Sequence, residues 1–249
     1  MKKKKNKYLK IRFKFIFFLF IAVSIVFIAW YFVVEREVFN LRSITVEGLH
    51  SYDEEYFLKE VEIELGMNIF FINEKRINRD VEEMLRIREV EVQRNLPDRV
   101  SIRVEERAGQ FLLNYGGNFF LIDTDGIIFD KAQDAKEYDL PCLVDEMYGE
   151  VELGKGISEG DAFFLFSLLK KMPATTLKNI SEVSYINGDV VMYTVNGVKV
   201  LWGDDAENFQ VKLKVFEKLP AIAEDYGNVE YIDIRYGDNP IIKTLESGD

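Results

Sequence analysis

The chain has 249 residues, of which 48% are hydrophobic and 30% charged, and this balance excludes wholesale disorder because it can bury a core. The length fits two modest domains beside a targeting segment. The formal net charge of −11 hides an asymmetry, since residues 1–14 carry eight Lys or Arg and no acid, whereas the rest holds all 43 acidic residues and is therefore disfavoured for nucleic-acid binding.

The first predicted element is a membrane-spanning helix at residues 15–34, with the sequence FIFFLFIAVSIVFIAWYFVV. Ser24 is its only conventionally polar residue, and a helix of this length spans about 30 Å, the thickness of the hydrocarbon core of a bilayer. The apolar stretch is longer than the roughly 7–15 residues of a signal-peptide core, and the VVEREVF that follows has no small-x-small cleavage site. We therefore interpret this segment as an uncleaved anchor.

The charges on either side of this helix predict its orientation. Eight positive charges precede it and the sequence Glu-Arg-Glu follows it, which places residues 1–14 in the cytoplasm as a basic tail and the rest of the chain outside. Such a short tail cannot bury a core, so we expect it to act as a topology determinant that anionic lipid also attracts. The chain has one cysteine, Cys142, which excludes an intramolecular disulfide framework.

Residues 41–107 are predicted to form a small domain of β-α-α-β-β order. Ile44 and Val46 alternate with polar residues in a strand that Gly48 ends. Ser51 and Glu54 match a capping box, and the helix that they begin is expected to run to Gly66. The apolar face of this helix is formed by Phe57, Leu58, Val61 and Leu65.

A second helix and a β-hairpin complete this domain. Asn73 is expected to cap the helix. The helix presents an apolar face of Ile77, Val81, Met84 and Leu85. In REVEVQRNLPDRVSIRVEE, apolar and polar residues alternate on both sides of a turn at Pro97-Asp98, which predicts two paired strands. We expect two helices to cover one face of the sheet and the other face to stay polar.

Residues 108–243 are predicted to form a second, mostly antiparallel β-domain with helices, which makes the chain α+β, and residues 244–249 a short tail. FLLNYGGNFFLIDTDGIIFD predicts a three-stranded meander, and residues 158–172 a buried helix. The runs VSYI, VVMYTV and VKVLW are separated by two Asn-Gly pairs, which predict consecutive antiparallel strands. Residues 209–219 fit both a strand and a helix.

Few residues offer enzyme chemistry, and we predict no catalytic, cofactor-binding or metal-ligating residue. His50 is the only histidine, which excludes His-based triads and HExxH zinc sites. Cys142 lies in an apolar segment with no histidine nearby, so a packed thiol is expected. A glycosidase-like pair among the abundant carboxylates stays open, and it defines the alternative of a membrane-anchored, cell-wall-modifying enzyme.

Several motifs follow one another along the chain. After the basic tail and the single span come SITVEGLHSYDEEYF, GMNIFFIN, VQRNLPDRVSIRVEERA, FFLIDTDGIIFD, VNGVKVLWG and YIDIR. This ordered set, from Met1 to about Lys243, resembles the bacterial division protein family FtsQ/DivIB. The chain departs from the family pattern at Gly109, where a proline is common, and in its short tail TLESGD. The resemblance identifies residues 41–107 as a POTRA-like domain and favours a helix at residues 209–219.

The stretch VEYIDIRYGDNPIIK, residues 229–243, predicts a last strand in which side chains alternate between two faces, with an exposed row formed by Tyr231, Asp233 and Arg235. If this strand lies at a sheet edge, its free N–H and C=O groups can accept a strand from another chain, and an interior position is the alternative. The resemblance places the family's Asp-x-Arg element on Asp233 and Arg235. The predicted partner-binding residues are Tyr231, Ile232, Asp233, Ile234, Arg235, Tyr236, Ile241 and Ile242.

The resemblance also implies a function, a location and partners. It implies a non-catalytic bitopic scaffold of the division complex, with the N-terminus in the cytoplasm and the C-terminal domains outside, at the division septum. The implied partners are the small single-pass proteins FtsB (DivIC) and FtsL and the septal peptidoglycan synthase. We expect no cofactor and no nucleic acid, and the POTRA-like domain would offer a second interface.

Overall fold

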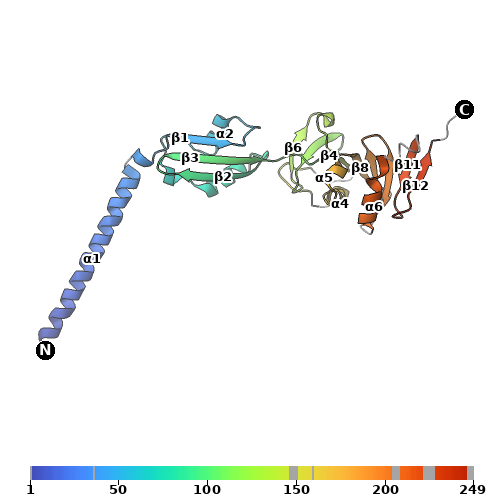
Figure 1. Cartoon of the computed structure of the whole chain (residues 1–249). Coiled ribbons are helices and arrows are strands. Elements are labelled where there is room, and N and C mark those ends of the chain that lie inside the picture. Colours follow the sequence, from blue (N-terminus) through green and yellow to red (C-terminus); the bar gives the residue numbers. More distant parts are fainter. Residues whose placement is uncertain are drawn as a thin grey trace. The chain divides into compact units, whose positions relative to one another are not determined.

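The structure is a computed structural model, and it describes residues 2–35, 37–145, 151–158, 160–203, 208–220 and 228–245 (Figure 1). The first element is the helix α1, Lys2–Glu35. Within it, the stretch Lys14–Tyr31 is long and apolar enough to cross a membrane by its length and composition. The predicted helix at residues 15–34 is therefore confirmed as a helix. The chain divides into two compact units, residues 1–106 and 107–249.

The first unit contains a three-stranded sheet in the order β1-β3-β2. Its strands are β1 Ser43–Glu47, β2 Ile87–Asn95 and β3 Arg99–Glu106. The central strand β3 pairs antiparallel with β2 and parallel with β1. The helical elements are η1 Glu37–Phe39, α2 Glu54–Glu60, η2 Ile69–Phe71 and α3 Glu74–Val81. The β-α-α-β-β order is confirmed, and the core includes Phe57, Ile69, Ile77, Val100 and Ile102.

The helix α2 differs from the prediction at both ends. Its N-cap is Asp53, whose Oδ1 accepts the backbone N–H groups of Glu55 and Tyr56 at 2.9 and 3.3 Å. The predicted cap, Ser51, instead donates its hydroxyl to Glu106 Oε2 at 2.6 Å. The capping-box prediction was wrong because a carboxylate on β3, far away in the sequence, binds the Ser51 hydroxyl.

The expected continuation of this helix to Gly66 was also wrong. Glu62 adopts a left-handed φ of 51°, and the N–H of Ile63 donates to Leu58 O at 3.0 Å, so the chain leaves the helix and buries Ile63. Leu65, expected on the apolar face, is 64% exposed. The second helix follows its prediction, because Asn73 Oδ1 accepts the N–H of Arg76 at 3.3 Å and caps α3.

The second unit is built on one sheet whose strands, within the described residues, run in the order β12-β11-β10-β9-β8-β7-β4-β5-β6. The first six are β4 Phe111–Tyr115, β5 Asn118–Ile122, β6 Ile128–Ala132, β7 Cys142–Val144, β8 Ile180–Ile186 and β9 Asp189–Thr194. The last three are β10 Lys199–Gly203, β11 Val229–Asp233 and β12 Ile241–Thr244. Three of the pairings, β4 with β7, β7 with β8 and β10 with β11, are parallel, and the others are antiparallel.

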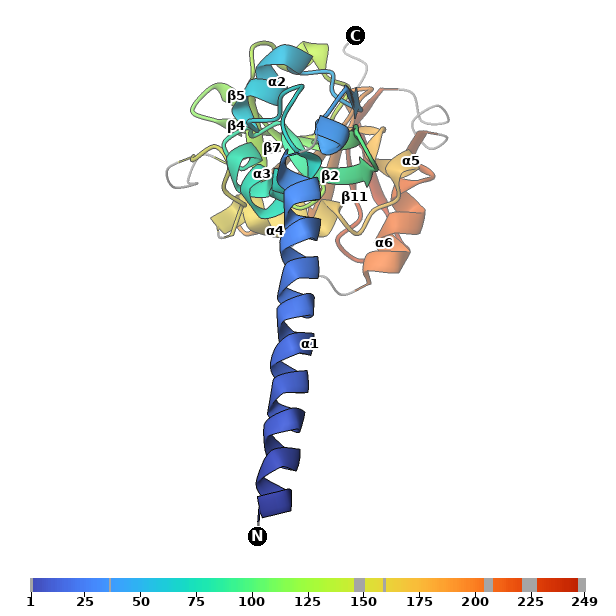
Figure 2. The same ribbon diagram turned by 90° about the vertical axis from the view of Figure 1, so that its left-hand side faces the viewer.

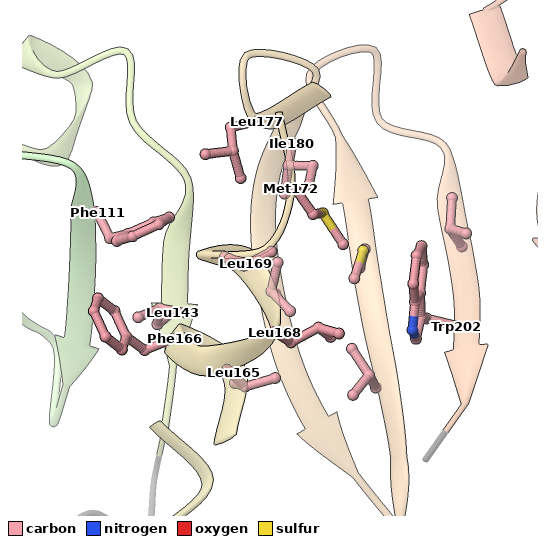
Figure 3. Packing of buried hydrophobic residues seen from close by; sticks show 14 of the residues in the cluster. Phe111, Leu143, Leu165, Phe166, Leu168, Leu169, Met172, Leu177, Ile180 and Trp202 are labelled. Carbon is pink, nitrogen blue, oxygen red and sulfur yellow. The ribbon is translucent and has the colours of Figure 1, made fainter. Parts of the chain in front are cut away.

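Three helices, α4 Gly160–Leu169, α5 Ala174–Leu177 and α6 Phe209–Phe216, pack on one face of this sheet. The short helix η3 Ala135–Glu137 packs with a smaller cluster on the other face, formed by Leu112, Leu121, Phe129 and Ala132. Side chains from α4 and α6 share one core with the sheet, and both helices are seen beside it in Figure 2. Figure 3 shows Phe166 of α4 beside Phe111 on the left, Leu169 of the same helix in the middle and Trp202 on the right. The α+β class, the β4–β6 meander, the β8–β10 hairpins and the helix at residues 209–216 are confirmed.

Candidate functional site

The stretch expected to be a last strand folds into two strands. The first, β11, ends at Asp233 and is not at the edge, because it pairs parallel with β10 on one side and antiparallel with β12 on the other. The expectation of one last strand over residues 229–243 was therefore wrong, and of the two positions that the sequence left open, β11 occupies the interior one. The edge position belongs to β12, Ile241–Thr244, and no other described strand pairs with its outer side.

A turn at residues 234–240 separates the two strands. Asp233 Oδ1 accepts the backbone N–H of Arg235 at 3.0 Å, and the N–H of Gly237 donates to Ile234 O at 3.2 Å. Gly237 has a φ of 83°, a conformation that favours glycine. Tyr236 therefore lies in the turn, 72% exposed, and does not continue the strand.

The pairing pattern indicates which backbone groups of β12 face outward. The N–H of Ile234 donates to Leu201 O of β10 at 3.0 Å, so the alternate residues Tyr231 and Asp233 direct their backbone groups toward β12. Tyr231 lies opposite Lys243, and Asp233 lies opposite Ile241. By alternation, the N–H and C=O groups of Ile242 and Thr244 point away from β11, at the free edge.

The side chains around this edge combine apolar and charged groups. Ile241 is 54% exposed and Leu245 55%. Lys243 Nζ lies 2.9 Å from Glu230 Oε2 and 5.5 Å from the centroid of the Tyr231 ring. The Lys243–Glu230 pair links β12 to β11. The exposed side chains of Ile241 and Leu245 lie next to this pair and can contact apolar residues of a partner.

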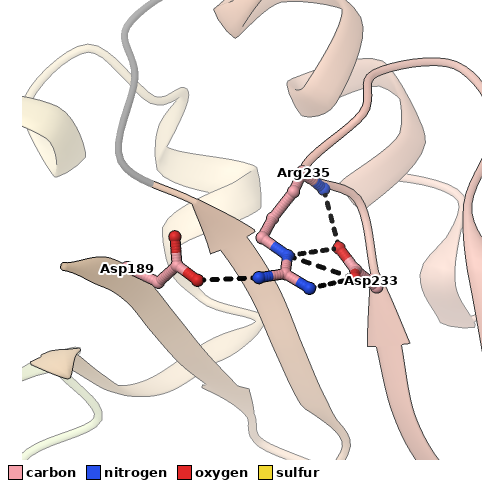
Figure 4. Close-up of polar contacts among 3 residues, drawn as sticks. All are labelled: Asp189, Asp233 and Arg235. Atoms are coloured by element: carbon pink, nitrogen blue, oxygen red, sulfur yellow. Dashed lines mark hydrogen bonds and ion pairs between the residues drawn. The ribbon is translucent and has the colours of Figure 1, made fainter. Parts of the chain in front are cut away.

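An ion-pair cluster holds the turn in place (Figure 4). Arg235 Nη2 lies 2.7 Å from Asp233 Oδ2, and Nη1 lies 2.8 Å from Asp189 Oδ2. Arg235 Nε donates to both oxygens of Asp233 at 3.0 and 3.1 Å. Gly203 on the neighbouring strand has a φ of 91°, and a Cβ there would lie 3.0 Å from Arg235 Cγ. The cluster thus joins β9, β10 and the β11–β12 turn.

The cluster changes the titration of its members. Burial by itself would raise the pKa of the Asp233 carboxyl, but hydrogen bonds from the Arg235 side chain and backbone, with the charges of Arg235 and Lys212, outweigh burial and lower this pKa below its usual value. The hydrogen bond to Asp233 is the main cause that raises the pKa of Arg235. Both groups are therefore held in their charged forms at neutral pH.

The predicted partner-binding residues fall into two groups. Ile232, Ile234 and Asp233 are buried, so the expectation that Asp233 lies on an exposed row was wrong. The guanidinium of Arg235 is what allows this carboxylate to be buried. Among the predicted partner-binding residues, Tyr236 and Ile241 are exposed. The side chains of Tyr231, Arg235 and Ile242 are half-buried. Sequence reasoning missed Asp189, which lies 46 residues before Arg235 and carries no local signal of their contact.

Two of the described carboxylates, those of Asp145 and Asp161, come together at the start of α4. Asp145 Oδ2 accepts the N–H of Ala162 at 2.7 Å at the start of α4. Burial, and then the charge of Asp145, raise the pKa of Asp161. No group of three or more His, Cys, Asp or Glu that could hold a metal ion is found in the part of the chain that the structure describes.

Comparison with known proteins gives matches along both units. Residues 39–107 match the family model "POTRA domain, FtsQ-type", and residues 112–235 match "Cell division protein FtsQ/DivIB, C-terminal". A cell division protein FtsQ of Rickettsia bellii is 31% identical over 198 residues, covering 79% of this chain and 69% of that protein. A cell division protein DivIB of Clostridium botulinum is 25% identical over 247 residues, covering 95% of each.

A solved structure is also similar to part of the chain. It is the major extracytoplasmic domain of the cell division protein DivIB from Geobacillus stearothermophilus, with 19% identity and a TM-score of 0.33. The match covers 48% of this chain and 92% of that domain.

Proposed function

Since the chain belongs to the FtsQ/DivIB family of cell division proteins, we propose that it is a non-catalytic, membrane-anchored scaffold of the division complex that captures partner proteins on its C-terminal sheet edge. Residues 1–14 would lie in the cytoplasm and residues 15–34 in the membrane. Residues 41–107 and 108–243 would form two extracytoplasmic domains at the division septum. The partners would be FtsB (DivIC) and FtsL homologues, which the scaffold would link to septal peptidoglycan synthesis.

The observation that carries this proposal is the free side of β12. Outward-pointing N–H and C=O groups at Ile242 and Thr244 can bond a partner strand in the way that a sheet gains a strand. These backbone bonds supply affinity whatever the partner's sequence, whereas the exposed Tyr236, Ile241 and Leu245 side chains select apolar residues beside them. An interface of this kind needs no catalytic group.

Proline at position 242 tests the role of the backbone. Ile242→Pro removes an N–H that points away from β11 and meets no other strand of the described residues, so the variant should remain folded, because an edge strand tolerates proline on its open side. Ile242→Ala is the matched control, because it keeps the N–H and shortens the same side chain. The proposal expects the proline variant to lose most of the FtsB and FtsL homologues recovered from membranes, and the alanine variant to retain them.

The measurement is co-purification from membranes with the full-length chain, with partners identified by mass spectrometry. Equal recovery of partners by Ile242→Pro and Ile242→Ala, at equal unfolding temperatures, would count against strand addition. Deletion of residues 241–249 is a further variant that removes β12 entirely. If it still retains the partners at the level of the intact chain, the docking site lies elsewhere on the protein.

The enzyme alternative makes a different prediction. A cell-wall-modifying enzyme would release soluble fragments from purified peptidoglycan, and single substitution of one Asp or Glu would abolish that release. The relatives that match are named cell division proteins. We expect no fragment release by the full-length chain, measured by chromatography of the soluble products.

A further inference from the structure

Exposed apolar side chains gather at one end of the first unit. Beyond α1, the large hydrophobic residues exposed among its described residues are Val38, Tyr56, Leu65, Phe70, Phe71 and Leu96. Tyr56 lies in α2, away from this end, whereas Val38, Phe70, Phe71 and Leu96 belong to it. Val38 and Phe70 lie close to the segment that precedes β1. The ring of Phe39, the residue after Val38, has its centroid 5.1 Å from that of the Phe70 ring. Phe71 follows Phe70 in the short helix η2. These side chains are 46–59% exposed, far more than a core role would allow.

Arg94 joins the η2 segment to the β2–β3 hairpin. Its Nε and Nη2 donate to Ile69 O and Ile72 O at 3.3 and 2.8 Å, and its Nη1 contacts Glu74 at 2.6 Å. Leu96, 60% exposed, lies two residues further along the chain. The Arg94 guanidinium binds the carbonyl groups of Ile69 and Ile72, on either side of Phe70 and Phe71. It therefore holds the η2 loop in a conformation in which these two side chains are exposed.

Exposed basic side chains lie at the same end of the unit, together with the carboxylates of Glu74 and Asp98. Arg42 and Arg99 side chains are 71% and 74% exposed, and they share one carboxylate, Asp98, at 3.7 and 3.9 Å. Lys75 is exposed in the first turn of α3. Apolar residues with surrounding cations are typical of a surface that enters the interface of a membrane, where cations meet lipid phosphates. The opposite end of β3 carries Glu105 and Glu106.

The covalent link to α1 brings this surface to the bilayer. Phe39 lies four residues after the end of α1 at Glu35, so the two are separated by at most about 14 Å of extended chain. The apolar stretch ends at Tyr31, only four helical residues, or about 6 Å, before Glu35. Each headgroup layer is itself roughly 5–8 Å thick. Phe70 and its neighbours are therefore within reach of the outer leaflet.

We propose that this end of the first unit docks on the outer leaflet of the membrane that α1 spans. Val38, Phe70, Phe71 and Leu96 would enter the interface, with Arg42, Lys75 and Arg99 next to lipid phosphates. The inference rests on the anchoring proposed above. The contact would hold the POTRA-like unit against the lipid and reduce its freedom to swing about the short connection after Glu35.

Spin labels in the full-length chain test this docking. In a Cys142→Ser background, single cysteines replace Phe71, Glu55 and Ser24, and the labelled chain is placed at one copy per nanodisc of phosphatidylglycerol and phosphatidylcholine. Collision with oxygen reports lipid, and collision with a water-soluble nickel chelate reports water. Glu55 is the control because it lies in the first turn of α2 and follows Ser51, whose N–H bonds Glu106 at the opposite end of β3.

The expected result is loss of nickel collisions at position 71 relative to position 55. Adding Leu96→Ser to the position-71 variant should restore them, with thermal unfolding unchanged because Leu96 is 60% exposed. Equal nickel access at positions 71 and 55, with Ser24 in lipid, would overturn the docking alone. A water-exposed label at Ser24 would overturn the anchoring and the docking together. Protection that appears only with two copies per disc would identify a second chain as the occupant and overturn the lipid proposal.

Discussion

The Arg235 cluster makes a quantitative prediction, which Arg235→Met tests. The substitution keeps most of the aliphatic length but removes three contacts to Asp233 and one to Asp189. Asp233 is only 5% exposed, so water cannot fully replace the guanidinium. Losing a fully buried ion-pair partner costs about 3–5 kcal/mol. Here the Arg235 side chain is 35% exposed and Lys212 still faces Asp233, so we expect about 2 kcal/mol.

This cost corresponds to a measurable shift in thermal unfolding. For a unit of this size, about 2 kcal/mol lowers the unfolding temperature by roughly 4–8 °C. Calorimetry of the full-length chain in detergent at pH 7 measures the shift. Asp233→Asn is the matched partner variant, and the double variant should destabilise by less than the sum of the single effects, because the two residues interact directly.

The same cluster has a pH dependence whose sign follows from Asp233. The pKa of this carboxyl is lower in the folded protein than in the unfolded chain, where it is about 3.9. The stabilisation is therefore complete above pH 4–5, and it is lost as the pH falls through the folded-state pKa. Arg235→Met should weaken this acid dependence. Additive effects in the double variant, or an unfolding temperature within 1 °C of the intact chain at every pH, would refute the reasoning.

Three further predictions concern other contacts. Gly203→Ala should lower the free energy of unfolding by about 1–2 kcal/mol, because the φ of 91° at Gly203 is left-handed and the added Cβ would press on Arg235. Calorimetry measures this loss. Gly188→Ala is the control, because its Cβ would have no neighbour within 4 Å and the variant therefore carries only the backbone strain. Glu106→Ala should destabilise the first unit by about 1 kcal/mol, measured by urea unfolding, because Ser51 Oγ loses a 2.6 Å hydrogen bond. Burial raises the pKa of Glu106, but the hydrogen bonds from Ser51 and His50 outweigh burial and lower this pKa overall. The difference between the variant and the intact chain should therefore vanish as the pH falls through the folded-state pKa of Glu106. Cys142 should react slowly with a thiol reagent at pH 8 and rapidly after unfolding, because burial, and then the charge of Glu182, raise its pKa to about 12; rapid reaction in the folded chain would contradict this.

Local sequence determined those elements whose information lies within a few neighbouring residues. The length and apolarity of residues 15–34 suffice to predict the helix that is found there. Two Asn-Gly pairs, such as Asn187-Gly188 with φ of 53° and 91°, place the β8–β9 and β9–β10 turns because their backbones adopt left-handed conformations at low cost. Asn73 caps α3 as its residue type and position indicate. Each of these depends on contacts no more than a few residues apart.

The tertiary structure decided which strand lies at the edge of the sheet. The alternation in VEYID is the same whether a strand has one neighbour or two, so it cannot tell an edge from an interior position. Here β11 pairs with β10, about thirty residues earlier, and the chain then reverses after Asp233 to add β12 outside it. This non-local pairing places the candidate docking edge at Ile241–Thr244, the last part of the stretch 229–243.

Long-range contacts also decided the roles of single side chains. The Ser51 hydroxyl does not cap α2 as predicted, because it binds the carboxylate of Glu106, which is 55 residues away in the sequence. Asp233, expected on an exposed row, is buried because Arg235 supplies it with compensating charge and hydrogen bonds, and Asp189 of β9 binds the same guanidinium. Sequence determined which backbone conformations and apolar faces are available, because these depend on neighbouring residues. Only the folded chain decides which polar group meets which partner, because that choice depends on how distant segments come together.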